Sequence, residues 1–107
     1  MDIPQITING KTYRMPKKPK MNLWRHLVKF EEDQRTGEIQ GQQVLDEMYN
    51  LVAIAFNNEE VTGEVVEANF DFEEIINVFT YIREYVKKLA ALKIAQLPKN
   101  AIAPART

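Results

Sequence analysis

The residues that could take part in catalysis are few and poorly placed for it. His26 is the only histidine and the chain has no cysteine, which excludes histidine or thiolate metal clusters and a cysteine nucleophile. Acidic residues come as neighbours, as in Glu59-Glu60 and Glu73-Glu74, and adjacent side chains on a helix point about 100° apart rather than into one cleft. The four glycines form no phosphate-binding loop. We therefore expect a protein that is not an enzyme and that uses no cofactor or metal.

The charged residues fall into three blocks along the chain. Residues 1–30 hold seven Lys/Arg and one Asp, residues 31–75 hold thirteen Asp/Glu and one Arg, and residues 76–107 hold six Lys/Arg and one Glu, which leaves a net charge of −1. The acidic middle would compete with a nucleic acid for the basic ends, so nucleic-acid binding is disfavoured. The pattern favours contacts between ends and middle, within one chain or between copies. The alternative is that these are solvated faces with no partner.

Length and composition limit the class of protein. With 107 residues, of which 45% are hydrophobic and 27% charged, the chain has room for one core. No apolar stretch approaches the roughly 18–20 residues that cross a bilayer. The first residues include Asp2 and Pro4, which do not suit a secretory signal. We expect a cytoplasmic protein with a single domain over residues 1–97 and a flexible tail over residues 98–107.

Local patterns predict a hairpin and then two helices. Apolar and polar residues alternate on both sides of Asn9-Gly10, which predicts a type I′ hairpin within residues 5–15. Asn22 is a candidate cap for a helix over residues 22–33. Apolar residues recur at helical spacing over residues 42–56, and the asparagines that follow suit the end of a helix. Thr62 is placed to cap a further short turn.

The last helix is predicted to be long. Asp71 and Glu74 have the spacing of a capping box. No Gly or Pro follows before Pro98, so the helix is expected over residues 71–97. Its length of about 39 Å exceeds the diameter of about 34 Å of a compact globule of this size, and it should project beyond the body or fray. The fold class is therefore mainly α with a short N-terminal β-hairpin, a small helical domain with a long C-terminal helix.

This helix carries two apolar seams. The second seam lies beside the first and, left in water, would expose roughly 300–400 Å² of apolar surface. We therefore expect another molecule to cover it; the alternative is a helix buried centrally in its own domain. The first seam, which suits the chain's own core, comprises Phe72, Ile75, Phe79, Ile82, Val86 and Leu89, and the second comprises Val78, Tyr81, Tyr85 and Leu92.

Three stretches, taken in order over about residues 6–90, resemble a known family. They are Ile8 to Tyr13 with the Leu23-Trp24-Arg25 helix after it, Ile54 to Thr62, and Asn69 to Ile76. Together they resemble the tail assembly chaperones of long-tailed phages and prophages of Gram-positive bacteria.

The resemblance implies a non-enzymatic role in building a phage tail. Such proteins bind the tape measure protein and keep it soluble, contact the major tail protein, and leave before the tail is complete. The chain is then expected in the host cytoplasm and not in the mature virion. A permanent structural subunit of the tail or its connector and a small DNA-binding regulator that uses Lys17 to Lys20 remain as alternatives.

Periodicity, rather than the resemblance, predicts the contact residues. The charge blocks and the second seam together favour a homo-oligomer. Trp24 on the first helix is added as an anchor. The expected partner-binding residues are Trp24, Val78, Tyr81, Tyr85 and Leu92.

Overall fold

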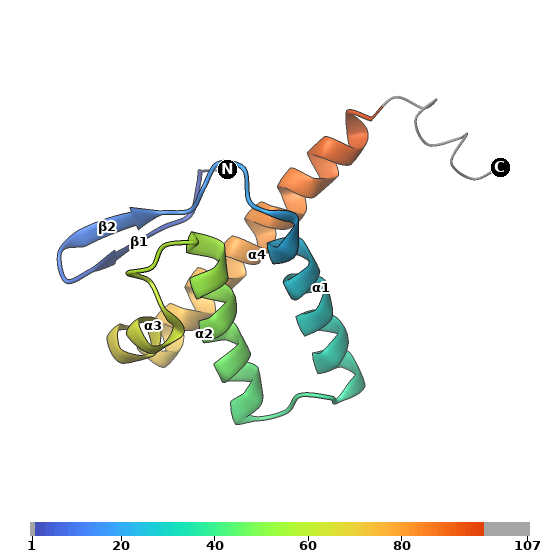
Figure 1. Ribbon diagram of the computed structural model, residues 1–107. Coiled ribbons are helices and arrows are strands. Elements are labelled where there is room, and N and C mark those ends of the chain that lie inside the picture. Colours follow the sequence, from blue (N-terminus) through green and yellow to red (C-terminus); the bar gives the residue numbers. More distant parts are fainter. Residues whose placement is uncertain (1, 98–107) are drawn as a thin grey trace.

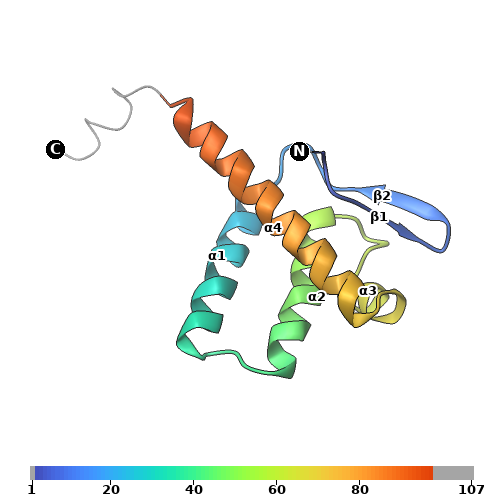
Figure 2. The same ribbon diagram turned by 180° about the vertical axis from the view of Figure 1, so that it is seen from behind.

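The computed structural model describes residues 2–97 as an N-terminal hairpin followed by four helices. α1 and α2 lie side by side and antiparallel, and α4 crosses behind both of them, as the view from behind shows (Figures 1 and 2). The predicted mainly helical fold, with its short hairpin and long last helix, is thus confirmed, whereas the predicted tail over residues 98–107 lies outside the described residues. The elements are β1 (Gln5–Ile8), β2 (Lys11–Arg14), α1 (Met21–Thr36), α2 (Gln42–Phe56), α3 (Gly63–Asn69) and α4 (Phe72–Ala95).

The hairpin packs on its own chain. Asn9 and Gly10 have φ values of 52° and 80°, as a type I′ turn requires. The antiparallel register places Ile6 opposite Tyr13. Ile6 and Ile8 point to the same side and are both buried in the core. The hairpin therefore needs no second chain to cover its apolar face.

α1 begins one residue earlier than predicted. Its N-cap position is Lys20, which makes no capping bond through its side chain. The Leu23 amide already donates to the Lys20 carbonyl at 3.1 Å, so Asn22 lies inside the first turn. The prediction of Asn22 as the cap was wrong, because the extended connector before the helix ends at Lys20.

α1 also continues beyond the acidic residues at which it was expected to end. Gly37, with a φ of 82°, terminates the helix after Thr36, because this left-handed conformation suits glycine. Within the last turns, Lys29 pairs with Asp33 at 2.8 Å. The acidic residues are therefore part of the helix and are stabilised there by neighbours one turn away.

The other helix ends follow the predicted local chemistry. Asn57 ends α2 with φ 48° and ψ 47°. The Val65 amide donates to the Thr62 hydroxyl at 3.2 Å, which caps α3. At the start of α4, the Glu74 amide donates to Asp71 Oδ1 at 2.8 Å and the Asp71 amide donates to Glu74 Oε1 at 2.9 Å. The predicted capping box is confirmed.

The described chain is elongated because α4 projects. Its radius of gyration is 15.7 Å, compared with about 13 Å for a compact chain of this length. Residues 91–97 are all exposed, and the end of α4 extends away from the other helices (Figure 1). The body that remains is held by one core, formed by Ile6, Ile8, Met15, Leu23, Leu27, Phe30, Leu51, Val52, Ala55, Phe56, Val61, Val66, Ile75, Phe79, Ile82 and Val86.

Candidate functional site

One face of α4 lies in the core. Ile75, Phe79, Ile82 and Val86 are at most 5% exposed. The Phe79 ring meets the Phe30 ring of α1 edge to face, with centroids 5.1 Å apart and planes at 65°, an arrangement that adds to the energy of burial. The central part of the first predicted seam is therefore used within the chain.

The two ends of the first seam lie outside the core. Phe72 is 63% exposed and Leu89 is half-buried. The prediction that Phe72 belongs to the core seam was wrong. Phe72 is the first residue of α4, and Ile75, one turn later, is the first residue of the helix that is buried in the core.

The second seam is divided into a sheltered part and a bare part. Val78 and Tyr85 are half-buried and pack against the core. Tyr81 is 36% exposed, and its hydroxyl donates to the backbone carbonyl of Asp2 at 2.7 Å. Leu92, which is 53% exposed, lies on the projecting end. Part of the second seam, which was expected to be exposed to solvent unless a partner covered it, is therefore covered by the chain itself.

Trp24 lies on another element. It is half-buried on α1 and packs against the core.

Besides the contact between the Phe30 and Phe79 rings, an ion pair joins α1 to α4. In it, Lys87 Nζ donates to Glu31 Oε2 at 2.7 Å. Of the five predicted residues, Val78 and Tyr81 lie next to each other on α4, where they line the same hollow. Trp24 lies on α1 and packs against the core. A partner-binding role for any of the five predicted residues stays a prediction.

Two further exposed apolar side chains lie near Leu92. Ile94 is 61% exposed and Leu97, just after α4, is 51% exposed. The sequence analysis did not predict either residue. The predicted length of the helix could have indicated both, because apolar residues on the part of a helix that projects beyond the domain cannot be buried in its core. We call Leu92, Ile94 and Leu97 the α4 end patch.

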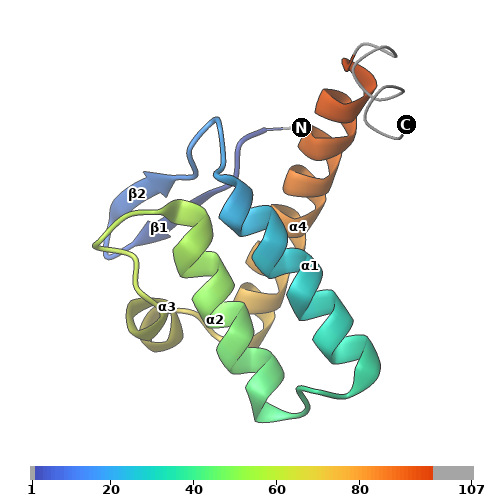
Figure 3. The same cartoon turned by 45° about the vertical axis from the view of Figure 1, so that its right-hand side comes forward.

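The N-terminal segment and α4 line an open surface hollow of about 760 Å³. The N-terminal segment leads from the hairpin toward α4 (Figure 3). Val78 and Tyr81 line the hollow on the α4 side, and Ile3 and Pro4 line it on the other side. The second seam at Val78 and Tyr81 therefore faces an open hollow rather than close packing.

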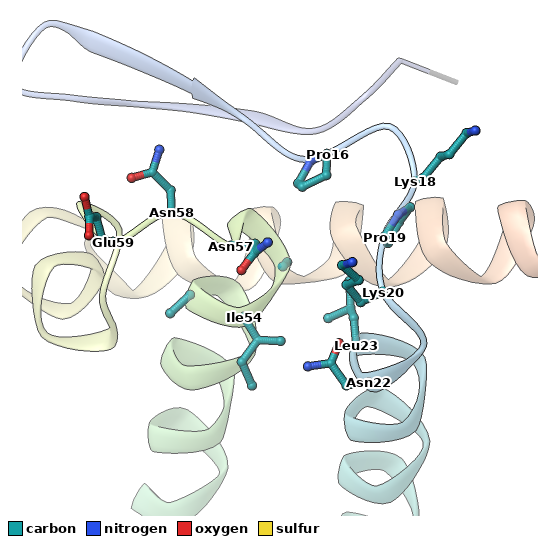
Figure 4. A pocket seen from close by; sticks show the side chains of 12 residues that line it. Pro16, Lys18, Pro19, Lys20, Asn22, Leu23, Ile54, Asn57, Asn58 and Glu59 are labelled. Carbon is teal, nitrogen blue, oxygen red and sulfur yellow. The ribbon is translucent and has the colours of Figure 1, made fainter.

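A second hollow, of about 440 Å³, lies between the start of α1 and the end of α2. Lys20 and Asn22, at the start of α1, line one side of it, and Ile54 and Asn57, at the end of α2, line the other side (Figure 4). Its lining mixes proline, aliphatic, amide and charged side chains. Its lining contains no histidine, serine or cysteine.

The charged groups with the clearest mutual effect tie the hairpin to the loop after α2. Lys11 Nζ and Tyr13 Oη both donate to Glu60 Oε1, each at 2.7 Å. These hydrogen bonds hold the pKa of the Glu60 carboxyl below its usual value, and Glu60 raises the pKa of Lys11 and of Tyr13. Lys11 and Glu60 are exposed and Tyr13 is half-buried, so the cluster ties the hairpin to this loop at the edge of the core.

Residues 2–97 contain neither a candidate metal cluster nor a candidate membrane-spanning helix. No three acidic or histidine side chains in this part gather closely enough to hold a metal ion. None of the helices in the same range has the length and hydropathy needed to cross a membrane.

Comparison with protein families gives one match. Residues 4–89 match the model of a family described as phage tail chaperone protein. No curated protein and no solved structure matches the chain. The family match covers the hairpin, α1 to α3 and most of α4, and it stops before the α4 end patch. Because it includes well over half of the residues, the chain belongs to the phage tail chaperone family.

Proposed function

We propose that the chain is a tail assembly chaperone that binds the tape measure protein of its phage and keeps it soluble until the tail tube is built. The family supports a chaperone role in tail assembly. The exposed α4 end patch is the observation that supports the end of α4 as the binding surface. The chaperone acts by binding, without catalysis, in the host cytoplasm, with the major tail protein as a further contact. Long-tailed phages of Gram-positive hosts are its proposed source.

The α4 end patch suits a helical partner. Its side chains retain 51–61% of their exposure. Fully burying one aliphatic side chain contributes about 1.5–3 kcal/mol, so covering the remaining half of three of them contributes roughly 2–4 kcal/mol. Leu92 and Ile94 are two positions apart and point to different sides of the helix, so an amphipathic partner helix would lie along the side that carries Leu92. The tape measure protein, a long helical chain in the family that this sequence resembles, has that character.

The charges around the patch define the partner further. Lys88 and Lys93 are exposed, and residues 85–97 contain no Asp or Glu. A partner helix with acidic residues beside its apolar stripe is therefore favoured, and its association should slow as salt is added. The patch lies outside residues 4–89, which match the family. It is a suitable place for one chaperone to select its own partner.

Co-expression with the tape measure protein tests the proposal. The wild-type chain should keep that protein in the soluble fraction and co-purify with it. The double variant Leu92→Gln/Ile94→Gln should co-purify less, because glutamine preserves helix propensity but removes the apolar contact. The matched control, Met21→Gln/Val28→Gln, removes two exposed apolar side chains from α1 and should behave as wild type. A tape measure protein that aggregates equally with and without the chain would refute the proposal.

A permanent tail subunit could use the same patch, and the composition of finished particles separates the two roles. A chaperone leaves before assembly is complete, so mass spectrometry of purified virions should not find it. Detection of the chain at a stoichiometric level would replace the chaperone proposal with the structural one.

We also propose that copies of the chain associate end to end. Residues 57–77, which include α3 and the first turns of α4, contain seven Asp/Glu and no Lys/Arg, whereas the far end of α4 is basic. The start of α4 lies beside α3, and its other end extends away from the other helices (Figure 1). The basic end of one copy can therefore approach the acidic end of the next, and a contact between unlike ends repeats without closing.

Sedimentation velocity at several protein concentrations tests this association. The wild type should form species larger than a dimer, and these should dissociate in high salt. Lys88→Glu/Lys93→Glu and Glu67→Lys/Glu73→Lys should each be monomeric alone. An equal mixture should regain the larger species, because each contact between the two variants again pairs unlike charges at the changed positions. A strict wild-type monomer at high concentration would remove this proposal and leave the chaperone proposal standing.

The charge reversals need a control for net charge. Glu38 and Asp46 are exposed and lie near the loop between α1 and α2, away from both ends of α4 (Figure 1). Glu38→Lys/Asp46→Lys changes the net charge as much as the acidic-end variant does. It should still associate as the wild type does.

A further inference from the structure

The residues before the hairpin lie against the second seam of α4. Pro4 is buried, and its carbonyl accepts a hydrogen bond from the Met15 amide at 3.0 Å. Beyond this fixed point, Ile3 is half-buried against the core. Asp2 then reaches α4, where its carbonyl accepts the hydrogen bond from Tyr81. Val78 and Tyr85 also pack against the core, whereas the contact of Tyr81 with this segment depends on one side-chain hydrogen bond.

This cover is loose. The hollow of about 760 Å³ lies between the segment and α4, and a space of that size lies within the range that protein sites offer to ligands. Tyr81 keeps 36% of its exposure even with the segment in place, and Asp2 is itself exposed. The segment thus occupies the seam but does not pack it as a core would.

We propose that Asp2 and Ile3 form a displaceable strap that occupies the seam until a partner helix replaces it. This inference rests on the proposed function, because the partner is the helix that the chaperone binds. The bond between the Met15 amide and the Pro4 carbonyl is the hinge, since it holds the hairpin end of the segment in place. With the strap away, Val78 and Tyr81 become accessible.

Displacing the strap joins two surfaces into one. Val78 and Leu92 are fourteen positions apart on α4, or about 21 Å along the helix axis. An open strap would leave an apolar stripe over that length, which ends at Leu92 of the α4 end patch. A partner helix could then lie along four turns of α4 rather than contact its tip alone.

The affinity of the wild type is reduced by the fraction of time that the strap is closed. Tyr81→Phe removes the hydroxyl that holds Asp2 and keeps the aromatic ring in the seam. The loss of one such hydrogen bond changes an equilibrium by about fivefold, which corresponds to about 1 kcal/mol. The variant should therefore bind a helical fragment of the tape measure protein about fivefold more tightly, by isothermal titration. Tyr49→Phe, on α2, is the matched control and should bind as the wild type does.

Deletion of residues 2 and 3 is the second variant. It removes the strap without altering α4, and it should bind at least as tightly as Tyr81→Phe. Unchanged or weaker binding by both variants would overturn the proposal, because the segment would then be inert or part of the binding surface.

A measurement without the partner separates this inference from the proposed function. In the free protein, Tyr81→Phe should lower the NMR order parameter of the Ile3 amide into the flexible range, below about 0.6, while that of Gln5 stays as in the wild type. An Ile3 amide that remains as rigid as in the wild type would overturn the strap. If the wild type fails to bind the tape measure protein, the proposed function falls and the strap is judged by this measurement.

Discussion

Replacing Phe79 with alanine tests whether one face of α4 carries the stability of the fold. Phe79 is 2% exposed and its ring lies 5.1 Å from the Phe30 ring. Truncating a buried phenylalanine to alanine costs about 3–5 kcal/mol. A domain of this size has a total stability of about 5–15 kcal/mol. Phe79→Ala should therefore remove a large fraction of the free energy of unfolding.

Urea denaturation followed by circular dichroism measures the loss. The midpoint should fall while the slope of the transition stays unchanged, since the surface exposed on unfolding is nearly the same. Ile82→Val is the milder variant, in case Phe79→Ala does not fold, and should cost about 0.5–1.5 kcal/mol. Leu92→Gln lies on the exposed end of α4 and should change the free energy of unfolding by less than about 0.5 kcal/mol.

Two outcomes would refute the reasoning. A loss at Leu92 comparable to the loss at Phe79 would mean that the end of α4 packs against the chain in solution, so that the α4 end patch is not free. A loss below about 1 kcal/mol at Phe79 would fall well outside the range for a buried aromatic residue. It would mean that α4 does not dock through this face.

Three smaller changes test local structure. Asp71→Ala removes the cap of α4 and should lower the free energy of unfolding by about 0.5–2 kcal/mol in urea denaturation. Gly10→Ala places a side chain at a φ of 80°, which costs about 1–2 kcal/mol and should broaden or shift the NMR signals of the hairpin. Because the pKa of Glu60 is lowered in the fold, its tie to Lys11 and Tyr13 should be complete above about pH 4.3, the ordinary value for Glu, and weaken as the pH falls through the lower pKa of the folded state. An NMR titration of the Tyr13 signals should show this loosening, and Glu60→Gln should abolish it.

Features that depend on a few neighbouring residues could be predicted from the sequence. The turn at Asn9-Gly10 and the capping box of Asp71 and Glu74 are confirmed, because each depends on groups within three residues of one another. The start of α1 was predicted wrongly for a related reason. Asn22 has the right chemistry for a cap, but the extended backbone that a cap needs is found at Lys20, and only the path of the connector determines that.

The second seam shows what periodicity cannot reveal. Spacing along α4 identifies which residues share a face, but the cover over Tyr81 comes from Asp2, which is 79 positions away. The projection of α4 could be predicted from its length alone, because a helix that is longer than the domain must extend beyond it whatever the tertiary contacts are. The end of α4, rather than the middle of the seam, is therefore the surface that most needs a partner. There Leu92, Ile94 and Leu97 remain at least half exposed, and no contact within the described chain competes for them as Asp2 does for Tyr81.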